Sequence, residues 1–198
     1  MNPVLIFALF AGVLPIHGQV LQSKRLSQHG VWHNFSQCPD DSFAYGFQLR
    51  YDKYKGLGLL RDDTGVNTIY LYCTPRHVSP RAEHKIFSGE GPYGDLGKIH
   101  KCRDEAYIVG FSTLFPGPQA FDDAGVENLR VLCSDGQEID GDGRDERRAK
   151  FWYASEPARC EGKRLVCGIS TQIEPKQGLG DDTGLNNVDM KCCDVSIG

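Results

Sequence analysis

The sequence predicts an all-β domain with internal pseudo-threefold symmetry, and three observations support this fold class. One pattern of cysteine, glycine and alternating apolar residues occurs three times in the 198-residue chain. The chain has 23 glycines, well above the average share of roughly 7 %. No amphipathic helix of useful length is apparent. Short strands with glycine-rich turns, present in three copies, are typical of an all-β architecture.

The first segment of the chain predicts secretion rather than part of the fold. Residues 1–18 form an apolar run without Asp, Glu, Lys or Arg, and the run is too short for the roughly 20 residues that span a bilayer. Such a run at an N-terminus is typical of a signal peptide, with Gly18 as the cleavage point. We therefore expect a secreted, extracellular product with one domain over residues 19–198 and no membrane span.

An aromatic-bearing segment ahead of the first cysteine of each repeat supplies a candidate strand. The three segments read GVWHNFSQ, GPYGDLGKIHK and KFWYASEPAR. With them, the repeats extend roughly over residues 28–79, 86–136 and 148–195. One repeat has too little sheet to be stable by itself, so the three are expected to share one core.

The next predicted strand follows each first cysteine. A glycine lies eight residues after that cysteine, in the pairs Cys38/Gly46, Cys102/Gly110 and Cys160/Gly168. Around it the segments read FAYGFQL, YIVGFST and LVCGIST, in which alternate residues such as Phe43, Tyr45, Phe47 and Leu49 are apolar. This period of two predicts a strand with one buried face. The glycine falls on the other face, where we expect another backbone to approach closely.

A further strand follows an acidic turn. Each repeat has two adjacent aspartates, then a glycine, and a cysteine 11 residues after the first aspartate. These residues are Asp62, Asp63, Gly65 and Cys73, then Asp122, Asp123, Gly125 and Cys133, and finally Asp181, Asp182, Gly184 and Cys192. Apolar residues alternate between the glycine and the cysteine, which predicts a strand entered through the Asp-Asp-x-Gly turn.

Eight cysteines in a secreted chain most simply form four disulfides. Zinc is disfavoured because the close C-x₂₋₄-C pairs of zinc sites are absent. If each repeat closes itself, the pairs are Cys38–Cys73, Cys102–Cys133 and Cys160–Cys192, and Cys167 pairs with Cys193. Since Cys192 and Cys193 are adjacent, exchanging their partners fits the same count.

These motifs resemble the vitelline membrane outer layer protein I family. The resemblance is carried by GLGDDTGLNNVDMKCC at 178–193, DDTGVNTIYLYC at 62–73, and C-x₇-GF at 38–47 and 102–111. It implies a secreted β-prism, in which three Greek-key sheets form walls around a packed interior. It also implies a role in an extracellular coat such as the outer layer of an egg's vitelline membrane, with links to lysozyme and to chito-oligosaccharide chemistry.

The sequence departs from the family pattern in three places. The middle repeat has Ala124 and Glu127 where the other repeats have Thr and Asn, and residues 135–150 are unusually charged. The family's Trp-rich leading strands are thinned to Trp32, Tyr93 and Trp152. These departures bear on an inherited sugar site more than on the fold.

The aspartate pairs have two interpretations. Glycosidic-bond chemistry needs two carboxylates at a set distance, which adjacent residues in one turn seldom present. Asp side chains in turns accept backbone N–H bonds, and a following glycine allows positive φ. A structural role is therefore favoured, a sugar contact by Asp63, Asp123 and Asp182 is the second interpretation, and no catalytic residue is predicted.

Aromatic residues and one glycosylation motif complete the candidate sites. Trp32, Tyr93 and Trp152 occupy comparable places ahead of the first cysteines, so they are glycan-stacking candidates, although packing is the commoner use of such residues. Asn34-Phe35-Ser36 makes Asn34 a candidate for N-glycosylation.

No cofactor or metal site is predicted. The stretch DGDGRDE at 140–146 is similar to a calcium loop, but Arg144 stands where an oxygen ligand belongs, so a solvated loop is favoured. The six histidines show no metal or triad spacing.

Composition and motifs together favour a secreted structural or interaction protein. A net charge of −4 without a basic stretch disfavours a nucleic-acid partner. The expected partners are extracellular-matrix or egg-coat proteins, glycans or lysozyme. The alternatives are a lectin-like glycan binder and, from the resemblance alone, a transferase acting on N-acetylglucosamine oligosaccharides.

Overall fold

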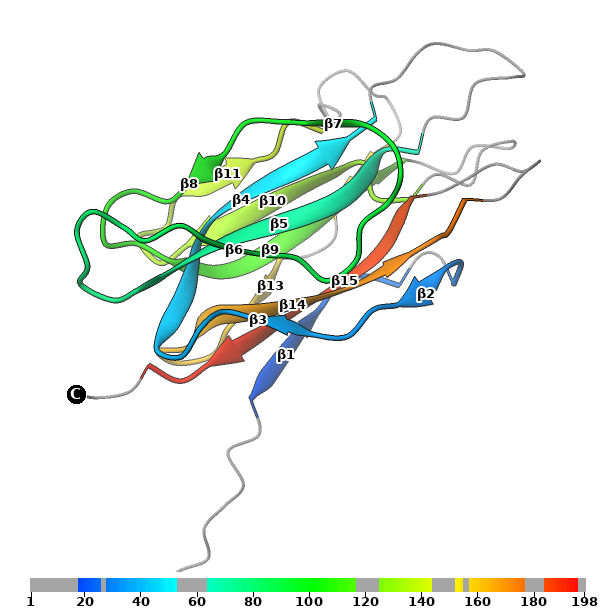
Figure 1. Ribbon diagram of the computed structural model, residues 1–198. Coiled ribbons are helices and arrows are strands. Elements are labelled where there is room, and N and C mark those ends of the chain that lie inside the picture. The colour runs from blue at the N-terminus through cyan, green and yellow to red at the C-terminus, as the bar shows by residue number, and fades with distance from the viewer. Residues whose placement is uncertain are drawn as a thin grey trace, which may run out of the picture.

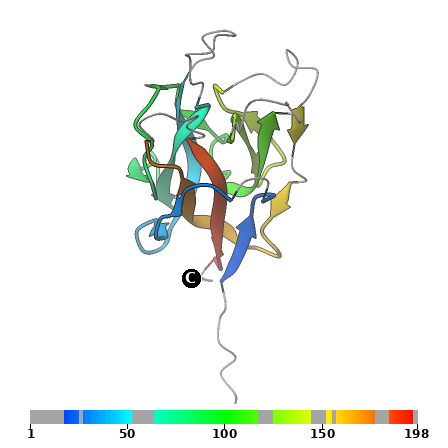
Figure 2. The ribbon, with the colours of Figure 1, turned by 90° about the vertical axis from the view of Figure 1, so that its right-hand side faces the viewer.

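The computed structural model describes residues 18–25, 28–52, 64–116, 125–143, 152–154, 157–176 and 184–195. Within these residues every regular element is a β-strand, and the strands form three five-stranded sheets. Figures 1 and 2 show the sheets as walls around a shared interior. The predicted fold class, an all-β prism of three sheets with internal pseudo-threefold symmetry, is confirmed.

A long antiparallel hairpin forms the centre of each sheet. The hairpins are β4 (Ser42–Tyr51) with β5 (Val66–Pro75), β9 (Ile108–Pro116) with β10 (Asn128–Cys133), and β14 (Leu165–Ile173) with β15 (Leu185–Cys193). These are the two strands predicted on either side of each acidic turn. We call the sheets first, second and third after the repeat that supplies the hairpin.

Shorter strands complete both edges of each sheet. One edge is formed by β6 (His84–Ile86) beside β5, β11 (Glu138–Asp140) beside β10, and β1 (Gln19–Gln22) beside β15. The other edge is formed by β7 (Asp95–Leu96) and β8 (His100–Lys101) beside β4, β12 (Trp152–Ala154) and β13 (Ala158–Arg159) beside β9, and β2 (Val31–Trp32) and β3 (Ser36–Gln37) beside β14.

The segment ahead of each first cysteine therefore belongs to the sheet of the preceding repeat. In the first and second sheets, the outer strand follows the hairpin and a last strand returns beside the first, which is a Greek key. In the third sheet, β1 and β2–β3 from the N-terminal part flank the C-terminal hairpin (blue beside orange and red in Figure 1). The two ends of the described chain are thus held in one sheet.

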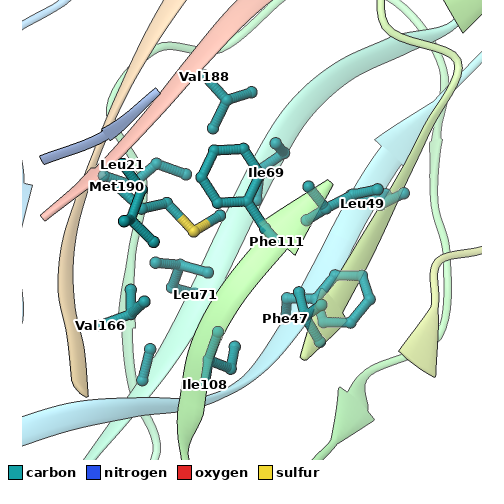
Figure 3. Packing of buried hydrophobic residues seen from close by; sticks show 14 of the residues in the cluster. Leu21, Phe47, Leu49, Ile69, Leu71, Ile108, Phe111, Val166, Val188 and Met190 are labelled. Atoms are coloured by element: carbon teal, nitrogen blue, oxygen red, sulfur yellow. The ribbon is translucent and has the colours of Figure 1, made fainter. Parts of the chain in front are cut away.

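Inward side chains from all three sheets meet in one core. Figure 3 shows residues of this cluster pointing toward one another from the three hairpins and from β1. The labelled members are Leu21, Phe47, Leu49, Ile69, Leu71, Ile108, Phe111, Val166, Val188 and Met190. Because no sheet encloses an interior by itself, the three repeats depend on one another for burial of their apolar faces, as the sequence predicts.

The alternation predicted for the first long strand breaks halfway along it. Phe47 and Leu49 lie in the shared core, whereas Phe43 and Tyr45 lie in a second cluster with the outward-facing tyrosines of β5. The prediction that all four face inward is therefore wrong. The cause is a β-bulge directly before Gly46, which shifts the register of the pairing.

The same bulge recurs in the other two sheets. The bulged residues are Tyr45, Val109 and Cys167. Cys167 thus takes the place of Tyr45 and Val109, as the repeat alignment predicts, but this place belongs to the outer cluster rather than to the core.

The glycine after each bulge allows an edge strand to approach. A Cβ at Gly46 would lie 2.7 Å from the carbonyl oxygen of His100, and a Cβ at Gly110 would lie 2.5 Å from that of Ala158. The corresponding distance from Gly168 to the oxygen of Ser36 is 3.0 Å. The close backbone approach expected opposite these glycines is present in all three sheets, because β8, β13 and β3 run there.

Three of the four disulfides join two different sheets. The N–H of Cys38 donates to the carbonyl of Cys167 in the third sheet (2.8 Å), while its partner Cys73 lies in β5 of the first sheet. Cys38–Cys73, Cys102–Cys133 and Cys160–Cys192 repeat this arrangement around the prism. The fourth disulfide, Cys167–Cys193, joins β14 to β15 within the third sheet. All eight cysteines are therefore bonded.

Backbone hydrogen bonds join the hairpins of different repeats where the second strands begin. The N–H of Val66 donates to the carbonyl of Val126 (2.8 Å), and the N–H of Val126 donates to that of Leu185 (2.6 Å). The preceding glycines Gly65 and Gly184 have φ values of 63° and 61°, which glycine adopts readily. The turn glycines therefore allow the three hairpins to meet. The aspartates ahead of them, at 62–63, 122–123 and 181–182, lie outside the described residues.

Candidate functional site

The outer face of the third sheet gathers polar side chains around an exposed tryptophan. Ile169 and Met190 point into the core, and the strand period places Ser170, Gln172, Asn187 and Asp189 on the opposite side. Trp32 of β2 is the register partner of Gln172. We call this surface the Trp32 face, made up of Arg25, Trp32, Ser170, Gln172, Asn187 and Asp189.

An ion pair anchors one side of the tryptophan. The Nη2 group of Arg25 donates to Oδ1 of Asp189, and the guanidinium carbon lies 4.6 Å from the ring centroid of Trp32. Arg25 also donates to the hydroxyl of Ser23 (3.3 Å), which in turn accepts from the N–H of Val188 (3.0 Å). The cation is therefore fixed over one ring face by a carboxylate and a hydroxyl that are themselves held by the sheet.

Burial affects the charge of this carboxylate. Burial raises the pKa of Asp189 above its ordinary value, and the hydrogen bond and charge of Arg25 oppose that rise. Because the pKa rises on balance, desolvation outweighs the ion pair. The pair orients Arg25 rather than contributing a large stabilisation.

On the other side of the Trp32 face, two side-chain amides hold the segment that leads into β2. Nδ2 of Asn187 donates to Oε1 of Gln172 (2.6 Å), and Nε2 of Gln172 donates to the carbonyl of Gly30 (3.1 Å). The φ of Gly30 is 87°, and a Cβ there would lie 2.5 Å from the carbonyl oxygen of Ile173. A glycine is thus required where the chain enters β2. The hydrogen bonds from Asn187 to Gln172 and from Gln172 to Gly30 then set the position of Trp32.

The indole of Trp32 remains in contact with water although its polar neighbours are buried. Trp32 is 41 % exposed, whereas Gln172, Asn187 and Asp189 are buried. At the other end of the sheet, Nζ of Lys191 donates to Oε1 of Gln37 (2.8 Å). An aromatic ring that is preoriented and exposed beside the part-exposed guanidinium of Arg25 can stack on a pyranose and offer its hydroxyls a hydrogen-bond donor.

The structure does not make the three predicted aromatic residues equivalent. By register, the places corresponding to Trp32 are taken by Leu96, paired with Arg50, and by Ala154, paired with Leu114. The prediction of comparable places is therefore wrong. Trp32, Leu96 and Ala154 each lie six residues before a first cysteine, whereas Tyr93 and Trp152 lie nine and eight residues before theirs. The Trp32 face is a feature of the third sheet rather than a threefold one.

The other candidate residues lie elsewhere. Tyr93 is half-buried, its N–H donates to Oδ1 of Asn67 (3.3 Å), and Nζ of Lys176 lies 5.6 Å from its ring centroid. Trp152 lies in β12, opposite Pro116, and its side chain is outside the described part of the chain. The sugar-contact candidates Asp63, Asp123 and Asp182 are also outside it. Asn34 is exposed between β2 and β3.

The described aspartates of the charged stretch at 140–146 are exposed, and they are held by contacts to neighbouring residues. Asp140 lies in β11 and accepts from Nε of Arg130 (2.6 Å). Asp142 pairs with the ring of His100 (3.2 Å) and accepts from the N–H of Lys98. Asp140 therefore belongs to a strand rather than to a loop, whereas the exposure to solvent that was predicted holds for Asp140 and Asp142. In the described ranges, no three His, Cys, Asp or Glu side chains are grouped as a metal site would require.

Sequence reasoning missed the partners of Trp32. Arg25, Gln172 and Asp189 come from three separate segments, and the contact from Arg25 to Asp189 spans 164 residues. One signal was available in the third repeat. Its second strand has polar residues at alternate positions 187, 189 and 191, where the first repeat has Thr68, Tyr70 and Tyr72. This alternation indicates a polar outer face for the third sheet.

Comparison with known proteins identifies the family. The sequence model of vitelline membrane outer layer protein I matches residues 19–195. The chain belongs to this family. Human vitelline membrane outer layer protein 1 homolog is 34 % identical over 165 residues, which cover 83 % of this chain and 77 % of the human protein. The mouse homolog is 33 % identical over 186 residues, covering 91 % and 86 %.

Solved β-prism structures share the fold of this family member. A prostate-specific WGA16 glycoprotein lectin superposes with a TM-score of 0.51 at 8 % identity, covering 87 % of this chain and 97 % of the lectin. Calystegia sepium agglutinin gives 0.51 at 10 % identity, with coverage of 87 % and 95 %. A mannose-binding jacalin-related lectin from Ananas comosus gives 0.50 at 6 % identity, with coverage of 88 % and 96 %. At such low identity these likenesses establish the fold alone. Among the described residues, none forms a helix that could span a membrane.

Proposed function

We propose that this protein is a secreted structural and interaction component of an extracellular coat, of the kind named by its family. The observation that carries the proposal is the match to vitelline membrane outer layer protein I over residues 19–195. The leader-like segment at 1–18 and the four disulfides support passage through an oxidising secretory compartment. Each sheet is cross-linked to the next, which suits a particle that must keep its shape outside the cell.

The proposed mode of attachment is recognition of glycans by the Trp32 face. The supporting observation is an exposed indole over which Arg25 lies, on a residue paired in register with Gln172. Proteins of the same fold are named as lectins, among them the mannose-binding protein from Ananas comosus. A glycan-bearing coat offers many copies of such a ligand, so weak single contacts would add up to firm retention.

Glycosyl transfer is not part of this proposal. Cleavage of a glycosidic bond uses two carboxyl groups that flank the bond. The Trp32 face has one carboxylate, that of Asp189, and Arg25 engages it. The face is therefore suited to binding a sugar rather than to reacting with it.

The coat function is tested by retention on isolated coats. Purified full-length protein, secreted from eukaryotic cells, is added to isolated egg vitelline membranes and washed, and the bound fraction is measured. We expect the oxidised protein to be retained and a reduced, alkylated sample to be washed away. Equal loss of both samples would contradict the coat function.

The glycan-binding mode is tested on a panel of immobilised glycans. Trp32→Ala is compared with the wild type and with Val31→Ala, a matched control at the neighbouring position, which is 61 % exposed. We expect binding to be lost with Trp32→Ala and kept with Val31→Ala. Coat retention that survives both Trp32→Ala and an excess of soluble glycan would instead indicate attachment through protein contacts.

A further inference from the structure

We propose that Asn34 carries an N-linked glycan that covers the aromatic side chains between the first and third sheets. This inference is independent of the glycan binding proposed above, because it concerns a sugar joined to the chain by a covalent bond. Asn34-Phe35-Ser36 is the one Asn-x-Ser/Thr motif in the sequence with x other than proline. Such a motif is the acceptor for glycosylation in the secretory pathway.

The folded chain presents Asn34 outward on a fixed backbone. Its side chain is exposed between β2 and β3, and within the described residues its amide is not engaged in a hydrogen bond. Its carbonyl accepts from the hydroxyl of Ser88 (2.8 Å). The same hydroxyl accepts from the N–H of Thr171 (3.2 Å), so the serine binds both the edge segment and the central strand of the third sheet. A glycan at Asn34 therefore extends into solvent without breaking any of these contacts.

Two exposed phenylalanines flank this hydrogen bond. Phe35 follows Asn34 and Phe87 precedes Ser88. Both phenylalanines are 40 % exposed. The ring of Phe87 is held edge-on against Tyr70, with 5.4 Å between centroids. Large apolar rings left in water are unfavourable, and the C–H face of a pyranose is suited to pack on them. The first sugars of a glycan on Asn34 are positioned to shield both rings.

The attachment is a balanced group transfer. Nδ2 of Asn34 forms a bond to C1 of the first N-acetylglucosamine of a lipid-pyrophosphate-linked oligosaccharide. The bond from C1 to the pyrophosphate oxygen breaks, the lipid pyrophosphate leaves, and Nδ2 gives up one proton. The hydroxyl of Ser36 belongs to the acceptor motif, so a residue with a hydroxyl is needed at that position.

The test uses the full chain secreted from cells that perform N-glycosylation. Intact mass and peptide mapping are compared for the wild type, Asn34→Gln, Ser36→Ala and Ser36→Thr. We expect a glycan on the wild type and on Ser36→Thr, and none on Asn34→Gln or Ser36→Ala. Digestion with peptide N-glycosidase should leave aspartate at position 34. A wild-type mass equal to that of the disulfide-bonded polypeptide would overturn the attachment. A sugar that persists in Asn34→Gln would place it elsewhere and overturn the assignment.

A second measurement tests the shielding. Enzymatic removal of the glycan from the folded protein should raise the fluorescence of a dye that binds apolar surface, and Phe87→Ser should reduce that rise. Unchanged dye binding would show that the sugar does not cover the rings. Trp32→Ala should leave the attached glycan unchanged, which separates this inference from the glycan-binding proposal.

Discussion

Cys38 and Cys73 form one disulfide although their backbones lie on different sheets. Cys38 is hydrogen-bonded to β14 of the third sheet, whereas Cys73 is part of β5 of the first. The same relationship recurs at Cys102–Cys133 and Cys160–Cys192. A bond between residues of one sequence repeat therefore acts as a link between two walls of the prism.

Removal of this link should open one corner of the molecule. The disulfide closes a segment with a sequence separation of 35, so Cys38→Ser/Cys73→Ser should lower the free energy of unfolding by about 3–4 kcal/mol on the loop-entropy model. Urea unfolding measures the loss, and hydrogen exchange locates it. We expect faster exchange in β3 and β5.

The matched control is Cys167→Ser/Cys193→Ser, which removes a disulfide inside the third sheet. Faster exchange should then be limited to the ends of β14 and β15. The same exchange pattern in both double variants would contradict the assignment of the first disulfide to a link between sheets.

The three bulge glycines should differ in their tolerance of alanine. A Cβ would meet a carbonyl oxygen at 2.5 Å at Gly110, 2.7 Å at Gly46 and 3.0 Å at Gly168. Overpacking of this kind costs about 1–3 kcal/mol, so Gly110→Ala should be the most destabilising and Gly168→Ala the least. Thermal unfolding of the three variants gives the order, and a reversed order would refute close approach as the reason for glycine.

The N-terminal strand should contribute to stability through one side chain. Leu21 is 4 % exposed in the core, while Val20 beside it is 41 % exposed. Leu21→Ala should cost about 2–5 kcal/mol, and Val20→Ala should stay within about 0.5 kcal/mol. Chemical unfolding measures both. Equal effects would mean that β1 does not close the third sheet.

The buried carboxylate of the Trp32 face should make stability depend on acidity. The pKa of Asp189 is raised from 3.8 by burial, so the folded state holds this proton more tightly than the unfolded state. The free energy of unfolding therefore falls as the pH rises through the window above 3.8. Below that window the group is protonated in both states and the penalty disappears.

Asp189→Asn lacks this titration and provides the reference. Relative to it, the wild type should lose stability as the pH rises above 3.8, as measured by urea unfolding at each pH. A wild type that instead gains stability over this range would show that the attraction of Arg25 exceeds the cost of burial.

The sequence was sufficient for features that recur at a fixed spacing. Alternation around Gly46 and between Gly65 and Cys73 predicts the hairpin β4–β5, and its two echoes predict the threefold fold. Periodicity could not assign the edge strands, because short segments such as β2 and β8 carry little pattern. Their partners are chosen by closure of the whole prism, which places β2 beside β14 rather than beside β4.

The candidate site was predictable only in part. Trp32 stands out as one of two tryptophans in the chain. Its partners Arg25 and Asp189 are joined across 164 residues, and no local pattern encodes such a contact. The bulge that turns Tyr45 outward depends on pairing between strands, so alternation by itself assigned that residue to the wrong face.

The most direct test of the account is the fluorescence of Trp32 during a glycan titration. Trp152→Phe leaves Trp32 as the one tryptophan of the 198-residue chain, so its emission reports on the proposed binding surface. Calorimetry on the same samples measures binding independently. Glycans selected from the panel should shift the Trp32 emission, and this shift should saturate together with the calorimetric signal. Calorimetric binding without any change in Trp32 emission, or no binding to any glycan, would contradict glycan recognition by the Trp32 face.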